Sequence, residues 1–141
     1  MNDIETRPDI EKLMEVFYSK ALKDDVIGYI FTDVAKLDLN HHLPIIADFW
    51  EMVLFQTVNF QEKYGRSPML THILLNEKTP LKKEHFVRWL KLFTETVNEN
   101  FVGEKAELIV YRAKAIANTM LIKVSSETSL GIPVVREKSS L

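Results

Sequence analysis

HLPIIADFWEMVLF, residues 42–55, is the most apolar stretch of the chain and decides how the fold must be built. A helix with apolar side chains on nearly every side is buried among several neighbours. Asp48 and Glu51 interrupt the run, so they are expected on the solvent side of the helix, and the run is too short and too charged to span a membrane. Pro44 fits best in a first helical turn, which predicts that the helix starts close to His41 and His42.

Three further segments have the apolar spacing of helices that could cover this stretch. The first repeats apolar residues at i, i+3, i+4 and i+7 through Ile10, Leu13, Met14, Phe17, Tyr18 and Ala21. The second carries Phe86, Trp89, Leu90, Phe93 and Val97. The third, after Gly103, carries Ala106, Ile109, Val110, Ala113, Ile116, Ala117, Met120 and Leu121. No segment alternates convincingly as a strand does, so the sequence predicts an all-α domain.

Two parts of the chain fall outside this helical pattern. The stretch SPMLTHILLN, residues 67–76, is a short element that Pro68 and Pro80 bound. Residues 124–141 are polar, contain Gly and Pro and show no helical period, so a flexible tail is expected after a folded domain of residues 1–123. Helices packed around an irregular middle section can enclose a cofactor pocket.

Composition excludes several classes of function. A net charge of −2 gives no reason to expect nucleic acid or an anionic membrane as partner. The absence of cysteine excludes disulfides, iron–sulfur clusters and thiol catalysis. The sequence also lacks a Gly-rich phosphate loop, a G-x-S-x-G motif and a His-Glu-x-x-His motif. The first residues do not follow the order of a secretion signal, so a cytoplasmic protein is expected.

The histidines are candidates for site chemistry, although a single histidine is most often a surface or half-buried side chain. That ordinary interpretation suits His85, which lies next to Lys82 and Lys83. Adjacent residues on a helix point about 100° apart, so at most one of His41 and His42 can face the core. His42 is favoured because an apolar stripe follows it, made of Ile46, Phe49, Trp50 and Val53.

Tyr18, His42 and Trp89 are polar-tipped side chains on the predicted inner faces of three different helices, and His72 lies on the short middle element. Each aromatic alone is most often a core residue whose OH or NH reaches a carbonyl or water. Together, hydrogen-bond donors facing one neutral imidazole are what a haem pocket for a diatomic ligand requires.

These residues resemble those of a truncated haemoglobin of group III. The resemblance covers about Ile10 to Met120 and rests on the segments LMEVFYSKAL, IGYIF, HLPIIADFW, YGRSPMLTHILL, HFVRWLKLF and YRAKAIANTM, in that order. The helix junctions lack the Gly-Gly turn of groups I and II. The resemblance implies a globin-like, two-over-two helical sandwich around haem b (iron protoporphyrin IX).

The resemblance also implies roles for individual residues. His72 is the expected proximal ligand of the haem iron, and Pro68 and Met69 set its approach. Tyr18 is the expected main distal donor to a bound ligand, and Trp89 is the second. His42 matches the distal histidine, which in this group acts as a gate as much as a ligand contact.

Other residues are expected around the haem. Phe31 matches the phenylalanine that wedges against it, Ile46 and Phe49 match its apolar lining, and Trp50 is expected to pack behind them. No basic residue occupies the early part of the distal helix, so Lys63, Tyr64 and Arg66 are the candidate partners of the haem propionates.

Three functions compete. The first is reversible binding of O₂, NO and CO at five-coordinate iron by a monomer. The second is an enzyme on the same haem that converts NO with O₂ to nitrate, or that handles peroxide, and this function needs an unidentified reductase. The third is a haemless helical interaction module, which leaves the set of Tyr18, His42, His72 and Trp89 without a reason.

Overall fold

The computed structural model describes residues 1–57, 59–65 and 78–129 of the 141-residue chain, with side chains placed up to residue 125. All the regular structure in these ranges is helical, which confirms the all-α prediction. None of the described helices is long and apolar enough to cross a membrane. His72, the expected iron ligand, lies outside the described residues.

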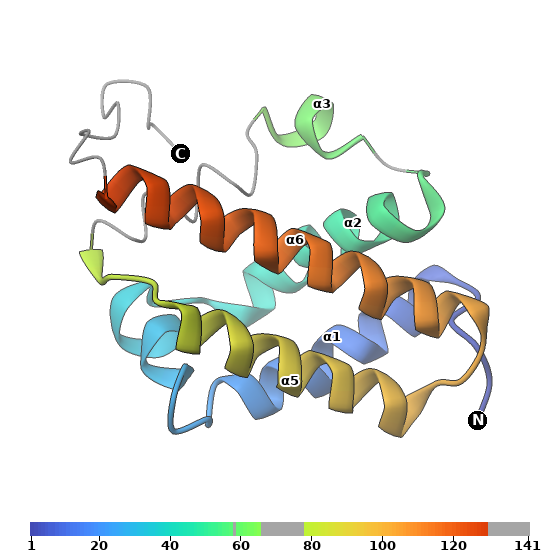
Figure 1. Cartoon of the computed structure of the whole chain (residues 1–141). Helices are drawn as coiled ribbons and strands as arrows, with labels where there is room; N and C mark the ends of the chain where they lie inside the picture. Colours follow the sequence, from blue (N-terminus) through green and yellow to red (C-terminus); the bar gives the residue numbers. More distant parts are fainter. Residues whose placement is uncertain (58, 66–77, 130–141) are drawn as a thin grey trace.

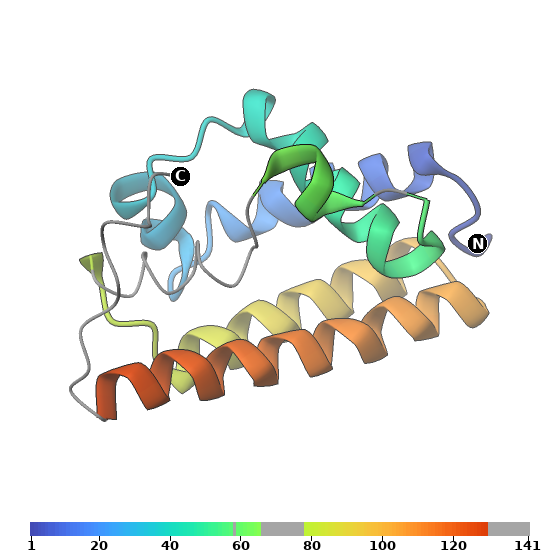
Figure 2. The ribbon, with the colours of Figure 1, turned by 90° about the horizontal axis from the view of Figure 1, so that it is seen from above.

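Four long helices form two layers (Figures 1 and 2). One layer contains α1 (Arg7–Ala21) and α2 (Leu39–Phe55), and the other contains α5 (Lys83–Asn100) and α6 (Glu104–Ser129). Between the layers, α1 packs against α5 and α2 packs against α6. The arrangement is therefore a two-over-two sandwich, as predicted.

Two short elements lie between the long helices along the chain. A π-helix, η1 (Ile30–Val34), lies between α1 and α2, and α3 (Phe60–Tyr64) follows α2. Asn59 caps α3 by accepting a hydrogen bond from the N–H of Glu62 at 3.0 Å. Gly65 ends α3 in the left-handed conformation, with φ of +69°, which glycine adopts without steric cost.

α2 begins earlier than its proline suggests. The helix starts at Leu39, so Pro44 is its sixth residue and not part of the first turn. A proline at this position removes one backbone hydrogen bond from the helix. The carbonyl of Pro44 accepts a hydrogen bond from Nη2 of Arg7 in α1 at 3.3 Å, so packing against α1 helps to hold this part of the helix.

α6 extends beyond the boundary expected for the folded domain. The helix continues to Ser129, and Val124 is only 1% exposed. Val124 follows Ala117 and Met120 at i+7 and i+4, so it lies on the same buried helix face. Polar residues follow Val124, so the sequence alone does not show that the helical spacing of apolar residues continues to this position. The rest of the expected tail, from residue 130, lies outside the described residues.

Four aromatic rings form a cluster where α1, α2 and α5 meet, named here the aromatic cluster: Phe17, Trp50, Trp89 and Phe93. The Trp89 and Phe93 rings stack at 5.0 Å with 12° between their planes, and Trp50 stacks on Phe93 at 4.9 Å. Phe17 meets Phe93 edge-on at 5.4 Å. The cluster joins the two layers, because Trp50 belongs to one layer and Trp89 and Phe93 to the other.

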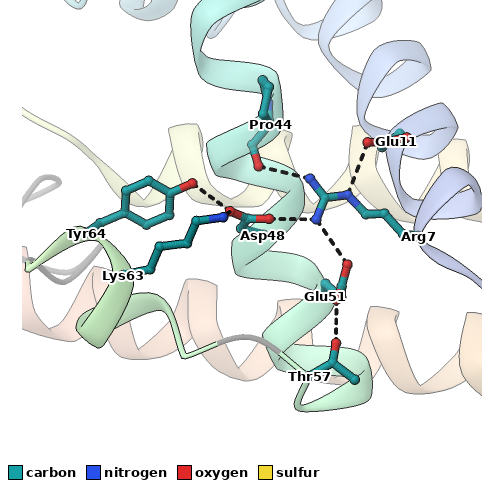
Figure 3. Close-up of polar contacts among 8 residues, drawn as sticks. All are labelled: Arg7, Glu11, Pro44, Asp48, Glu51, Thr57, Lys63 and Tyr64. Atoms are coloured by element: carbon teal, nitrogen blue, oxygen red, sulfur yellow. Dashed lines mark hydrogen bonds and ion pairs between the residues drawn. The ribbon is translucent and has the colours of Figure 1, made fainter.

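Asp48 does not lie on the solvent side of α2, which corrects the expectation from the sequence. Its side chain is buried and binds groups from two other helices (Figure 3). Oδ1 accepts a hydrogen bond from Nη1 of Arg7 in α1 at 2.6 Å. Oδ2 accepts hydrogen bonds from Nζ of Lys63 at 2.7 Å and from the hydroxyl of Tyr64 at 2.6 Å, both in α3.

Glu51 extends this network and is likewise not a solvent-side charge. Its carboxylate accepts hydrogen bonds from Arg7 at 3.0 Å and from the hydroxyl of Thr57. Charges can be buried inside a protein when they are paired and hydrogen-bonded. Arg7 satisfies that condition for both carboxylates, so α1 and α2 are joined by an ionic contact as well as by apolar packing.

The contacts of Asp48 control its ionisation. Burial by itself raises the pKa of the carboxyl group, but the hydrogen bonds from Lys63, Tyr64 and Arg7 outweigh burial and lower the pKa from 3.8 to about 2. A pKa that is lower in the folded chain than in the unfolded chain adds stability above the unfolded pKa. That stability is lost as the pH falls through the folded pKa.

We therefore expect Asp48→Asn to lower the free energy of unfolding at pH 7. The difference in free energy of unfolding between wild type and this variant should become smaller in acid. The gap should shrink by about 2 kcal/mol as the pH falls from about 4 to about 2, because one pKa unit corresponds to about 1.4 kcal/mol. Urea denaturation of both proteins across this pH range measures it. A gap that does not change with pH would contradict the ionic role of Asp48.

Candidate ligand-binding pocket

A pocket with a volume of about 150 Å³ lies between the two helix layers and opens to solvent. The wall is mostly apolar and aromatic, and the described residues that line it are Tyr18, Ile27, Ile30, Phe31, Phe49, Trp50, Leu81, His85, Phe86, Trp89, Ile116, Ala117 and Met120.

The turn between α1 and η1, together with the start of η1, brings Ile27, Ile30 and Phe31 to the pocket. Asp24 fixes this turn, because its Oδ2 accepts hydrogen bonds from the N–H groups of Val26 and Ile27 at 3.0 and 3.1 Å. Its Oδ1 forms an ion pair with Nη2 of Arg88 in α5 at 2.7 Å. The hydrogen bond from Arg88 outweighs burial and lowers the pKa of Asp24, so the carboxylate stays charged. The turn is therefore tied to the helix that carries Trp89.

Gly28 permits the close approach that this turn requires. A Cβ atom at this position would lie 2.8 Å from the carbonyl oxygen of Leu22, which is closer than two such atoms approach. The chain then enters η1, where Phe31 meets the Tyr18 ring edge-on at 5.7 Å. Phe31 and Tyr18 thus form adjoining parts of the pocket wall.

Tyr18 and Trp89 line the pocket, and their polar tips form no hydrogen bond with the described residues. The Tyr18 side chain is 9% exposed, and neither its hydroxyl nor the indole N–H of Trp89 bonds to any described residue. Within the described ranges, no fully buried polar side-chain atom lacks a partner, so both tips border open space. Burial raises the pKa of Tyr18, which keeps the hydroxyl protonated and able to donate.

Trp50 also lines the pocket, although the sequence indicated a place behind the lining. Its ring stacks on Trp89 at 6.2 Å with 18° between the planes. The residue is 4% exposed, and its indole N–H likewise bonds to no described residue. The pocket wall therefore includes two stacked indole rings, one from each helix layer.

His85 is a pocket residue that the sequence interpretation missed. The side chain is 8% exposed, not a surface imidazole, and it lines the pocket near the start of α5. Its Nδ1 accepts a hydrogen bond from the backbone N–H of Lys82 at 2.9 Å, and its Nε2 lies 3.4 Å from the hydroxyl of Tyr29. The available signal was its spacing of four residues before Trp89, which places both on one helix face.

The structure does not bring every predicted residue to the pocket. Phe49 lines it, whereas Ile46 packs against the core and is not among the lining residues. His42 is also not a lining residue, and its Nδ1 lies 2.9 Å from the carbonyl oxygen of Asp38 in the turn before it. Met69 and Arg66, like His72, lie outside the described residues.

The described wall offers hydrogen-bond donors and no acidic side chain. Its polar groups are one hydroxyl, two indole N–H groups and one imidazole, set among aliphatic and aromatic side chains. Such a wall suits an apolar, flat occupant together with a small ligand that carries negative charge.

The fold has a solved counterpart among the globins. The crystal structure of a group III truncated haemoglobin from Campylobacter jejuni superposes with a TM-score of 0.74 and is 30% identical in sequence. The match covers 88% of this chain and 95% of that one. The helical sandwich and its pocket therefore define a protein of the truncated globin class, which confirms the predicted fold.

The sequence comparison identifies the family within this class. A protein described as group 3 truncated haemoglobin ctb, also from Campylobacter jejuni, is 34% identical over 112 residues. The aligned region covers 77% of this chain and 83% of that relative. No protein-family model matches the sequence. The chain belongs to the group III truncated haemoglobins.

The contacts of His85 predict which ring nitrogen carries the proton. Nδ1 accepts the backbone N–H of Lys82, so the neutral ring must carry its proton on Nε2. We expect long-range ¹H–¹⁵N correlation spectra to show the Nε2–H tautomer for His85. A ring protonated on Nδ1 would contradict the hydrogen bond from the backbone N–H of Lys82. The exposed His41 provides a comparison signal in the same spectrum.

Proposed function

We propose that this protein binds haem b in the pocket between the layers and binds O₂, and also NO and CO, reversibly at the iron. The observation that supports the proposal is the pair of free donors, Tyr18 and Trp89, which border one apolar pocket. The two relatives reported above are both named truncated haemoglobins, and these names support a role in binding haem and gases.

The residues of the pocket suit a haem. Phe31, Phe49 and Phe86 give the wall flat apolar surfaces, and Ile116 and Met120 of α6 complete the apolar lining. Leu81 and Phe86 lie on either side of the start of α5, where His85 contributes the imidazole of the wall. In this proposal His72 holds the iron, which supplies a coordination position for a diatomic gas when haem is bound.

Tyr18 and Trp89 are proposed to stabilise the gas ligand. Hydrogen bonds are strengthened when the acceptor carries charge, and they act more strongly in a pocket shielded from water. The hydroxyl of Tyr18 stays protonated because burial raises its pKa, and an indole N–H is a donor only. Both groups therefore favour a ligand that gains negative charge at the iron.

The same two donors favour a second candidate function, conversion of NO with O₂ to nitrate or a related reaction with peroxide. Strong hydrogen bonds slow the release of O₂, which is unfavourable for simple oxygen delivery. This alternative requires a reductase as electron donor. Stopped-flow mixing of the O₂-loaded protein with NO, in the presence of cell extract, tests whether turnover occurs.

The first expected result concerns haem binding. Purified protein reconstituted with haem should show a Soret band, and His72→Gly should weaken it, with added imidazole restoring it by replacing the missing ring. His41→Gly is the matched control, because it removes an exposed imidazole that does not line the pocket. Equal haem binding by wild type and His72→Gly would overturn the assignment of His72.

The second expected result concerns the donors. Tyr18→Phe and Trp89→Phe should each speed O₂ dissociation by roughly 5- to 150-fold, since one lost donor is worth about 1–3 kcal/mol. Stopped-flow displacement of O₂ by CO measures the rate. Tyr111→Phe is the control, because that residue is 70% exposed on α6 and its hydroxyl lies outside the pocket lining. Unchanged rates in both pocket variants would show that the donors do not contact the ligand.

A further inference from the structure

We propose that His85 and Tyr29 form the binding site for a propionate carboxylate of the haem, at the solvent edge of the pocket wall. The inference rests on the proposed function, because a propionate reaches these residues only if the pocket holds haem. Haem combines an apolar ring system with two charged propionates, and a charge that leaves water needs a partner. A pocket that suits haem therefore needs polar groups in two places, one for the gas ligand and one for a carboxylate.

Two residues first expected to bind the propionates are already engaged (Figure 3). The hydroxyl of Tyr64 donates its one proton to Oδ2 of Asp48 at 2.6 Å. Nζ of Lys63 forms an ion pair with the same oxygen at 2.7 Å. Tyr64 is therefore not a donor to a propionate, and the charge of Lys63 is already paired. Arg66, the third candidate, lies outside the described residues.

Three of the four polar side chains in the described wall lie together, at the aromatic cluster. Phe17 meets the Tyr18 ring edge-on at 4.9 Å and the Trp89 ring at 5.6 Å. Trp50 stacks on Trp89 at 6.2 Å. These three side chains supply the donors that the proposed function assigns to the gas ligand or leaves beside it.

The fourth polar side chain, His85, lies nearer to solvent. It precedes Trp89 by four residues of α5, which is about 6 Å along the helix axis toward its start. Its described ring neighbour is Tyr29, with the two ring centroids 6.2 Å apart. His85 is 8% exposed and Tyr29 is 40% exposed, so the pair joins the buried wall to the protein surface. A charged group attached to a buried ring system requires a site of this kind.

His85 and Tyr29 have donor capacity that the described contacts do not use fully. Nδ1 of His85 accepts the backbone N–H of Lys82, so Nε2 carries the proton and donates. Nε2 lies 3.4 Å from the hydroxyl of Tyr29, which is longer than the 2.7–3.2 Å of an ordinary N–H···O bond. The hydroxyl has a proton of its own and bonds to no other described residue. Two adjacent donors, an N–H and an O–H, suit the two oxygens of a carboxylate.

The charge around the start of α5 also favours an anion. Lys82 and Lys83 are exposed there, and neither forms an ion pair with a described residue. Glu84 adjoins them, so two lysines and one glutamate leave a surplus of one positive charge. The N-terminus of an α-helix adds partial positive charge. The local potential therefore supports the donor pair without replacing it.

The test uses full-length protein loaded with protohaem or with protohaem dimethyl ester, which keeps the iron and the ring but has no carboxylate charge. His85→Asn places an amide oxygen near the position of Nδ1, so an acceptor for Lys82 remains while the Nε2–H donor is lost. Tyr29→Phe removes only the hydroxyl. Tyr111→Phe is the matched control, because it removes an exposed hydroxyl outside the pocket lining.

Transfer of haem to an excess of haem-free acceptor globin gives the rate of haem loss. We expect His85→Asn and Tyr29→Phe each to lose protohaem roughly 3- to 10-fold faster than wild type, because each lacks one donor to a charged acceptor near solvent. Both variants should lose the dimethyl ester at the wild-type rate, and Tyr111→Phe should match wild type with both haems. The propionate bending band in resonance Raman spectra of the protohaem form should shift in the two pocket variants only.

Equal acceleration of the loss of both haems would show that His85 and Tyr29 support the fold and do not bind a propionate. Unchanged loss of protohaem in both variants would overturn the inference as well. If His85→Asn does not fold, Tyr29→Phe decides alone, since it changes a partly exposed side chain. If wild-type protein takes up neither haem, the proposed function fails first and this inference with it. Haem uptake by wild type with unaffected variants refutes this inference alone.

Discussion

The contact on which the rest of the molecule depends is the stacking of Trp50, Trp89 and Phe93 between the two helix layers. Aromatic pairs of this kind contribute about 0.5–1.5 kcal/mol beyond the burial of their area. Phe93 is fully buried, whereas the two indoles also line the pocket. The same rings therefore hold the layers together and form part of the site, so the position of the donors follows from the packing of the core.

Two buried carboxylates hold segments of the chain that the stacked aromatic rings do not contact. Asp24 ties the turn before η1 to Arg88 of α5, and Asp48 ties α1 and α3 to α2. Apolar contacts have no direction, but hydrogen bonds to a carboxylate fix both distance and orientation. The two acids act on segments that are too short or too irregular to be positioned by apolar packing alone.

Residues whose position follows from helical periodicity were predictable from the sequence. The 3.6-residue repeat placed Tyr18 and Trp89 on inner faces, and the structure shows both in the pocket wall together with Phe31 and Phe49. Asp48 was misjudged because a charge in an apolar run is usually exposed, and its partner Arg7 lies 41 residues away. Such a pairing has no local signal. His85 was missed for the opposite reason, since its partner is the backbone N–H of a neighbouring residue, which no side-chain pattern reports.

The composition of the wall bears on which gases the proposed site would favour. Its described polar groups are hydrogen-bond donors, and none of the described lining residues is acidic. A donor stabilises a ligand in proportion to the negative charge on that ligand, so in the proposed site O₂ would gain more from Tyr18 and Trp89 than CO would. With two donors of about 1–3 kcal/mol each, the preference can reach several powers of ten. Selectivity would then come from the number of free donors and not from the shape of the pocket, because all these gases are small enough to enter.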